Sequence, residues 1–458
     1  MPTLIAVVDN HSSADMLPAM KPNILHANFS LLVSVTGLAL FSSISAVANW
    51  PAWRGPSGQG DVTSKDIPLR WSTTENVRWK VSLPDRGNST PAVWGEKVFI
   101  SQAVEKDHLR TLMCFSRHDG KLLWQKSVKY TPKEESHEDN PPCSASPATD
   151  GERVIVAHAS AGVYCYDFEG LELWQRDLGR QEFEWGSGSS PVLSGNLCFI
   201  YHGPGKGAHL VALNKKDGRT VWKYDEPAID VGKRTDGFRG QEPGIICTYS
   251  TPLVVKAAGR DELIMSFPRY LRAFDPETGK ELWHCDGLNP LVYTSPIYSD
   301  GIAVAMGGFS GNTIAVKTGG SGDVTASHRL WQSERTRAGI GTGVVRDGHV
   351  YVVNASGIAD CIEIKTGKIV WSERVKGDGP KSDTWSSSVL VGDRVYHLNQ
   401  SGDCVIFRAS PKFELLGANS LGNEMCNASL AVSNGDVFVR THKHLWCISQ
   451  KKDAASAR

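Results

Sequence analysis

A short motif recurs along this chain at intervals of about 40–60 residues, the length of one four-stranded repeat unit. In each copy a tryptophan falls four residues after a glycine. The copies are Asp119–Trp124, Glu169–Trp174, Asp217–Trp222, Ala273–Trp283 and Cys361–Trp371. Glycine allows a tight turn with positive φ, and the strand that follows places a large aromatic side chain at a fixed depth. Each copy therefore predicts a β-hairpin inside a larger repeated unit.

The tryptophan series extends beyond these five copies. Trp79 and Trp331 occupy the same place after degenerate turns, and we expect Leu416 to replace the tryptophan in the seventh unit.

A second pattern opens each unit with a serine or threonine, in five cases directly before a proline. The openings are Ser89–Pro91, Ser146–Pro147, Ser189–Pro191, Ser250–Pro252, Thr294–Pro296, Gly341–Gly343, Ser386–Ser388 and Ala428–Leu430. The last unit, from Asn427 to about Ile448, stops after three strands, and residues 76–83 can supply its fourth. We therefore predict an all-β, eight-bladed β-propeller of four-stranded antiparallel blades, closed by pairing of the N- and C-terminal strands. An open stack of repeats is the alternative, and the complementary chain ends disfavour it.

The N-terminus contains a targeting signal. The apolar run Phe29–Phe41 precedes Ser45–Ala48, which fits a small-residue cleavage site. We predict a signal peptide over residues 1–48, with Met20 as a possible true start, a propeller over 49–449 and a disordered tail over 450–458. The protein is then exported, periplasmic or extracellular, with no membrane span after cleavage. An uncleaved membrane anchor is the alternative.

Charge and cysteine usage narrow the function classes. The formal net charge is zero, so no basic field is present to attract nucleic acid. The ten cysteines include five at one third-strand position, namely Cys114, Cys165, Cys361, Cys404 and Cys447. Equivalent positions in different blades diverge, so we expect buried free thiols. Cys143, Cys247 and Cys426 precede the innermost strands, where they either ring the channel or are small packing residues. No spacing predicts a metal site.

The unit Ala273–Trp283 resembles the tryptophan-docking motif of the pyrroloquinoline quinone (PQQ) repeat family, and Trp50–Pro56 resembles the opening segment of exported bacterial PQQ-like propellers. The resemblance covers nearly all of the chain from Trp50 to Ile448 and implies the fold more than a function. The family includes quinoprotein alcohol dehydrogenases and an outer-membrane assembly lipoprotein that acts as a scaffold. The adjacent cysteine pair of the dehydrogenases and the anchoring cysteine of the lipoprotein are absent from this sequence.

The loops that enter the innermost strands are the expected binding surface. Trp185 and Trp385 lie outside the docking series and could stack on a planar ligand, with core packing as the alternative. Arg239 and Glu242 lie in the longest loop, and Arg335 and Arg337 could bind a carboxylate or remain solvated. The acidic stretch Lys133–Asp139 is expected to be a solvated loop.

These observations favour a non-catalytic, exported, monomeric propeller that binds an envelope or secreted protein. One alternative is a dehydrogenase dependent on PQQ and calcium, although no cofactor is predicted from the residues. Another is a carbohydrate-active enzyme, which would need paired carboxylates at one channel mouth.

Overall fold

The structure is a computed structural model that describes residues 48–63, 67–181, 185–229, 247–309, 311–334 and 339–450. These residues belong to one compact unit, Val47–Arg458. The predicted signal peptide and C-terminal tail lie outside the described residues, apart from Ala48 and Gln450.

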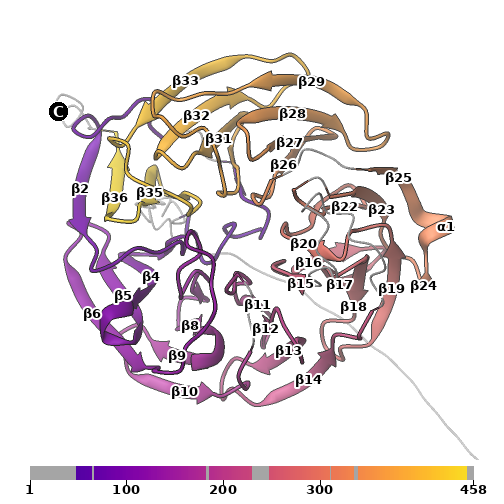
Figure 1. The fold of residues 1–458 in the computed structure, drawn as a ribbon, viewed down its shortest axis with the longest axis horizontal. Coiled ribbons are helices and arrows are strands. Elements are labelled where there is room, and N and C mark those ends of the chain that lie inside the picture. The colour runs from indigo at the N-terminus through magenta and orange to yellow at the C-terminus, as the bar shows by residue number, and fades with distance from the viewer. Residues whose placement is uncertain are drawn as a thin grey trace, which may run out of the picture. The chain divides into compact units, whose positions relative to one another are not determined.

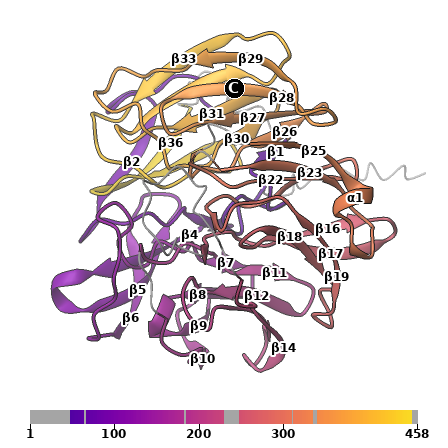
Figure 2. The ribbon, with the colours of Figure 1, turned by 45° about the vertical axis from the view of Figure 1, so that its right-hand side comes forward.

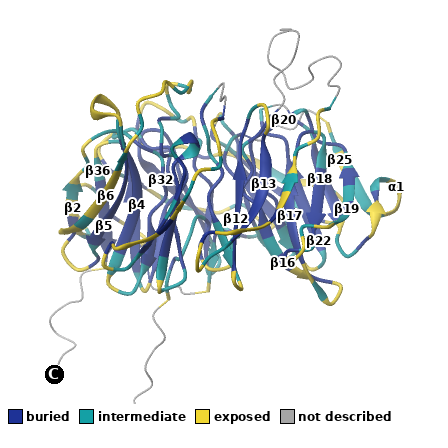
Figure 3. Cartoon of the chain, turned by 90° about the horizontal axis from the view of Figure 1, so that it is seen from below, coloured by how far each residue is buried: buried dark blue, intermediate teal, exposed yellow. Residues whose placement is uncertain are grey.

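Eight antiparallel four-stranded sheets are arranged as the blades of a ring, as predicted (Figure 1). Blade I contains β3 (Ala92–Trp94), β4 (Lys97–Val104), β5 (Leu109–Ser116) and β6 (Leu122–Lys129), and blade II contains β7 (Ala148–Thr149), β8 (Arg153–Ala157), β9 (Val163–Asp167) and β10 (Glu172–Arg176). Blade III contains β11 (Val192–Ser194), β12 (Leu197–His202), β13 (His209–Asn214) and β14 (Thr220–Asp225), and blade IV contains β16 (Leu253–Ala257), β17 (Arg260–Ser266), β18 (Tyr270–Phe274) and β19 (Glu281–Asp286). Blade V contains β21 (Ile297–Ser299), β22 (Ile302–Met306), β23 (Thr313–Lys317) and β25 (Arg329–Ser333). Blade VI contains β26 (Val344–Arg346), β27 (His349–Val353), β28 (Ile358–Glu363) and β29 (Ile369–Arg374). Blade VII contains β30 (Val389–Val391), β31 (Arg394–Leu398), β32 (Asp403–Arg408) and β33 (Leu415–Ser420). Apolar residues of the second and third strands are buried between neighbouring blades, while the outer strands and loops are exposed (Figure 3).

Blade VIII is built from both ends of the chain. It contains β34 (Ala431–Ser433), β35 (Asp436–Arg440) and β36 (His444–Ser449), and β2 (Val77–Ser82) pairs with β36 as the outer strand (Figure 2). In this pairing Trp79 lies opposite Cys447. The predicted closure is therefore confirmed, and all eight blades have their four strands.

Five docking tryptophans, Trp79, Trp124, Trp174, Trp222 and Trp331, pack against the glycine turn of the next blade. Trp222, for example, donates a hydrogen bond from Nε1 to the carbonyl oxygen of Pro276 at 2.8 Å. A Cβ atom built on Gly279, whose φ is +70°, would lie 2.5 Å from the Trp222 ring. A Cβ atom built on Gly120, Gly170, Gly218 or Gly367 would likewise lie 2.6–2.9 Å from the ring of the docked tryptophan. The glycine turn of one motif therefore contacts the tryptophan of the preceding blade, and the tryptophan of the same motif contacts the turn of the following blade.

Two blades depart from this pattern. In blade IV, Trp283 donates instead to Glu262 at 2.8 Å, and β24 (Gly322–Asp323) adds in parallel to β19, followed by α1 (Thr325–His328). In blade VII, the assignment of Leu416 to the tryptophan position is wrong. Gly417 lies opposite Ile406 in the position that corresponds to Trp124 opposite Cys114 in blade I, and Leu416 falls in the β-bulge.

For the same reason Cys404 is not equivalent to Cys114, because it pairs with Asn419 two residues further along the ladder. Cys404 is nevertheless buried, as are the other nine cysteines, and all ten are free thiols, as predicted.

The segment from Ala48 to Val62 crosses the ring axis. Trp50 pairs with Val93 of blade I, and β1 (Asp61–Val62) pairs in parallel with the inner strand β30 of blade VII. The free edge of an innermost strand faces the channel, so β1 occupies channel space. Within the described residues, no helix has the length and apolar character required to cross a bilayer.

Candidate functional site

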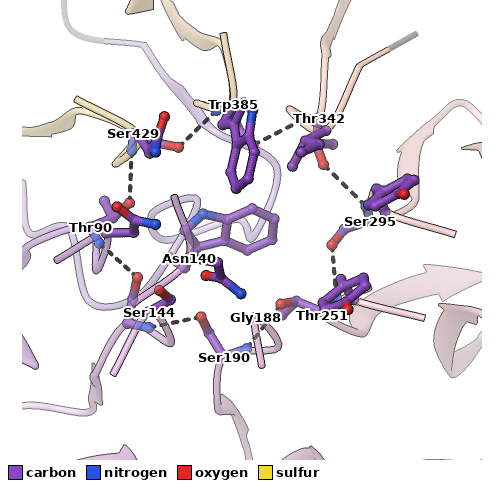
Figure 4. A pocket seen from close by; sticks show the side chains of 18 of the residues that line it. Thr90, Asn140, Ser144, Gly188, Ser190, Thr251, Ser295, Thr342, Trp385 and Ser429 are labelled. Atoms are coloured by element: carbon purple, nitrogen blue, oxygen red, sulfur yellow. Dashed lines mark hydrogen bonds between the residues drawn. The ribbon is translucent and has the colours of Figure 1, made fainter. Parts of the chain in front are cut away.

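A pocket of about 310 Å³ lies on the ring axis, at the end of the channel where the chain enters the innermost strands (Figure 4). Two tiers of residues build most of the pocket, and each blade contributes one residue to each tier. The lower tier lies two residues before each innermost strand, and the upper tier lies four residues before it. We call this cavity the axial pocket.

The lower tier consists only of serine and threonine. Its members, all buried, are Thr90, Ser146, Ser190, Thr251, Ser295, Thr342, Ser387 and Ser429. Each backbone N–H donates to the hydroxyl oxygen of the next blade at 2.8–3.2 Å, and the last bond, from Ser429 to Thr90, closes the circle (Figure 4). This hydroxyl ring satisfies the buried N–H group at each blade opening. It explains why the opening signature requires a hydroxyl.

The hydroxyl ring also gives the pocket donors. In the contacts of the described residues, these eight hydroxyls act only as acceptors. Each O–H proton is therefore available to an acceptor atom of a ligand in the axial pocket. An accepted N–H bond polarises the hydroxyl and makes it a better donor.

The upper tier varies from blade to blade. Its members in blade order are Asn88, Ser144, Gly188, Tyr249, Tyr293, Ile340, Trp385 and Asn427. Because the lower tier is uniform, the chemical differences between one side of the pocket and the other come from the upper tier and the loops around it.

The blades III to VI side of the pocket is aromatic. Tyr293 stacks with Trp185 at 6.4 Å and with Tyr249 at 5.8 Å between ring centroids, and it meets Phe309 edge-on at 5.3 Å. A two-stranded parallel ladder, β15 (Cys247–Thr248) with β20 (Leu291–Val292), holds the loops that carry these rings. The rings are thus positioned by paired backbone and by mutual packing.

The opposite side is polar and comes from blades I, II and VIII. Asn140 donates to the carbonyl oxygens of Trp185 and Ser187, at 2.7 and 3.2 Å. This approach requires Gly186, whose φ is +82° and whose added Cβ would lie 2.8 Å from the Asn140 amide nitrogen. Two further asparagine side chains fix the loop that precedes Asn140.

Asn88 and Asn427 both donate to the carbonyl oxygen of Asp139, at 2.8 and 3.1 Å. His137 of the same loop packs against Trp385 with ring centroids 5.3 Å apart. The expectation of a merely solvated acidic loop is wrong for Glu134, which forms a buried ion pair with Arg110 at 3.1 Å. The loop therefore belongs to the pocket rim.

The N-terminal segment contributes Trp53 to the pocket lining. Its neighbour Arg54 is buried and donates to the carbonyl oxygens of Thr342, Gly343 and Ser388, at 3.3, 2.6 and 3.2 Å. Burial lowers the pKa of the Arg54 guanidinium to about 9, and the Asp61 carboxylate opposes this shift. Arg54 thus fixes the segment across the channel beside the hydroxyl ring.

The predicted site residues have mixed outcomes. Trp185 and Trp385 both line the axial pocket. Arg239, Glu242, Arg335 and Arg337 lie outside the described residues. Sequence reasoning identified Trp385 and missed the other upper-tier residues, although their signal was present two residues before each serine or threonine of the opening motif.

Cys143, Cys247 and Cys426 are buried and do not line the pocket, which agrees with a packing role. Cys143 Sγ lies 3.4 Å from His158 Nδ1. Burial raises the pKa of the Cys143 thiol to about 12 and lowers the pKa of His158 to about 3. Both groups are therefore neutral near pH 7, and this pair is not an activated nucleophile.

Comparison with known proteins supports the repeat assignment. The sequence matches a family model described as outer membrane protein assembly factor BamB over residues 110–373 and 268–456. The outer membrane protein assembly factor BamB of Yersinia pestis is 23% identical over 360 residues, which is 75% of this chain and 80% of that protein.

Solved structures share the architecture. BamB from Moraxella catarrhalis has a TM-score of 0.56 at 14% identity, covering 82% of this chain and 97% of that chain. The quinohemoprotein alcohol dehydrogenase of Comamonas testosteroni has a TM-score of 0.60 at 11% identity, covering 90% of this chain and 82% of that chain. At these identities the likeness concerns the fold alone.

The described residues do not fit a calcium-bound quinone. Calcium binds carboxylate and carbonyl oxygens, and the carboxylates of PQQ need cationic partners. The described lining of the axial pocket contains no Asp, Glu, Lys or Arg side chain. The described parts of the chain also hold no cluster of three or more His, Cys, Asp or Glu side chains suited to a metal ion. The described lining also offers no carboxylate pair for glycoside hydrolysis.

Proposed function

Because the chain belongs to the PQQ-repeat propeller family described as outer membrane protein assembly factor BamB, we propose that it is an exported, non-catalytic propeller that binds partner proteins during outer-membrane protein assembly. The observation that carries this proposal is the chemistry of the axial pocket. It is lined by aromatic rings, amides and hydroxyls, and its described lining holds one imidazole, that of His137, and no carboxylate, ammonium or guanidinium group. Such a lining favours binding over acid–base or metal-assisted chemistry.

A genetic experiment in the native host tests the proposal. Deletion of the gene should lower the amount of folded outer-membrane β-barrel proteins, measured as heat-modifiable bands on gels. The wild-type gene and the surface variant Leu171→Ala should restore them, because Leu171 is 66% exposed on the outer rim of blade II. The pocket variant Trp385→Ala should restore them less. Unchanged barrel proteins after deletion would contradict the assembly function.

A second experiment addresses the enzymatic alternative. The purified chain should show no turnover of primary alcohols with PQQ, calcium and an artificial electron acceptor. Saturable turnover that requires both additions would contradict the non-catalytic role.

A further inference from the structure

We propose that the axial pocket binds one tyrosine side chain, presented by an exposed loop of a partner protein. This inference rests on the proposed function, because it names the chemical group by which a partner is held.

The aromatic side of the pocket matches the body of a tyrosine ring. Trp185, Tyr249 and Tyr293 are nearly parallel, with interplanar angles of 12° and 6° along the stack, and Phe309 presents an edge-to-face contact. Trp385 lies in the upper tier of blade VII, on the far side of the ring from blade III. Aromatic pairs at such distances contribute beyond the area they bury.

The hydroxyl ring matches the tip of the same side chain. The chain runs inward from the upper tier to the lower tier, so a group that enters between the aromatic residues meets the hydroxyls next. Thr251 and Ser295 follow Tyr249 and Tyr293 by two residues each, and they are 5% and 6% exposed. A phenol oxygen can accept from these O–H groups and donate to a ring oxygen. Phenylalanine would leave the buried hydroxyls without that acceptor.

The described lining disfavours charged groups. A carboxylate, phosphate or ammonium group would lose its hydration, and no described side chain of opposite charge lines the pocket to compensate. A sugar needs many directed amide partners. The amides of Asn88, Asn140 and Asn427 already donate to the backbone carbonyls that fix the rim.

A second cavity beside the axial pocket favours a ligand that is part of a polypeptide. It has a volume of about 320 Å³ and is lined by charged and polar groups, among them Glu138, Asp139, Lys381 and His442. Asn88 and Asn427 lie between the two cavities, since both line the axial pocket and each contacts Asp139 and one further residue of the second cavity, His442 or Gln400. An apolar anchor pocket beside a polar groove is the anatomy of a protein interface, with polar residues flanking one buried aromatic side chain.

Binding of short capped peptides tests the inference. The probe is acetyl-Gly-Ser-Tyr-Ser-Gly-amide with 3-fluorotyrosine, observed by fluorine NMR on the purified mature chain. It should bind saturably, and the unlabelled tyrosine peptide should displace it. The phenylalanine peptide should compete about 2- to 10-fold more weakly, the equivalent of one net hydrogen bond. The alanine peptide should not compete.

Variants locate the site. Trp385→Ala should weaken probe binding about 2- to 10-fold, the equivalent of one aromatic contact of this kind. Leu171→Ala should leave binding unchanged. Ser295→Ala should bring the tyrosine and phenylalanine peptides closer in affinity, and thermal melting shows whether each variant is folded.

Three results would overturn the inference: no saturable binding, equal affinity for the phenylalanine peptide in the wild-type chain, or displacement of the probe by maltose. If the peptide fails to bind while gene deletion still lowers the folded barrel proteins, the pocket inference alone is wrong. If the peptide binds and deletion has no effect, the assembly function is wrong and the tyrosine site stands.

Discussion

The hydroxyl ring predicts the effect of a nearly isosteric substitution, Thr251→Val. This change keeps the volume of the side chain and removes the oxygen that accepts the Ser190 N–H at 3.0 Å. Ser190 is 3% exposed, so its N–H has no access to bulk water when the acceptor is lost. An unsatisfied buried donor costs about 1–3 kcal/mol. The site borders a pocket that water can enter, so we expect a loss of about 1–2 kcal/mol in the free energy of unfolding.

Urea unfolding followed by circular dichroism measures this loss, and Thr251→Ser is the matched control. The serine variant keeps the acceptor and should be less destabilised than the valine variant. Ser429→Ala should lose a similar amount, because Ser387 donates to Ser429 at 2.9 Å in the equivalent place. Equal midpoints for Thr251→Val and Thr251→Ser would refute a stabilising role of the ring.

Three further predictions concern the propeller as a whole. Trp222→Ala should cost about 3–5 kcal/mol in urea unfolding, because a docked aromatic side chain and its hydrogen bond are both lost. A chain that ends at Asn427 should be unfolded by circular dichroism, because it lacks β34, β35 and β36 and leaves β2 without a partner. Burial lowers the pKa of His397 to about 3, so the folded ring stays neutral while the unfolded ring is protonated below about pH 6.5. Stability should therefore fall as the pH drops from 6.5 toward 3, by about 2 kcal/mol at pH 5 from this residue.

Matched variants separate these effects from general damage. Trp222→Phe keeps most of the packing and should lose only about 1 kcal/mol. A chain that ends at Ser449 should melt like the full chain, since it keeps blade VIII. His397→Asn should reduce the pH dependence by this residue's share, leaving the part due to other buried histidines such as His158, whereas His118→Gln, at an exposed site, should not change it. If the chain that ends at Asn427 melted like the full chain, ring closure would be contradicted.

The architecture was predictable because its two signatures reflect local geometry. A glycine turn followed by tryptophan gives the outer hairpin, and a serine or threonine before the inner strand gives the hydroxyl ring. The closure by β2 followed from counting strands in the last unit. These features repeat, so each copy supports the others even where one is degenerate.

The errors arose where one blade departs from the repeat. All eight blades carry a β-bulge directly before the tryptophan position, and in blade VII Leu416 falls in this bulge, so Gly417 takes the tryptophan position. A bulge inserts one residue into a strand without a clear sequence signal. The insertion that forms β24 and α1 also replaced a docking turn, so Trp283 bonds within its own blade.

The candidate site was only half predictable. Trp185 and Trp385 were identified because they lie outside the docking series and precede openings. Trp53 and Arg54 could not be placed, since their contacts join residues more than 280 positions apart in the sequence. The contribution of Tyr249 and Tyr293 depends on eight loops that meet at one axis, which only the closed ring reveals.

The central claim is that the axial pocket holds a partner protein, and site-specific photo-crosslinking in the native envelope tests it most directly. Benzoylphenylalanine is placed at position 385 in the pocket and, in a separate chain, at position 171 on the outer rim. The account predicts one discrete protein crosslink from position 385, reduced by Tyr293→Ala in the same chain, and a weaker or different pattern from position 171. Crosslinks from position 171 alone would contradict the account.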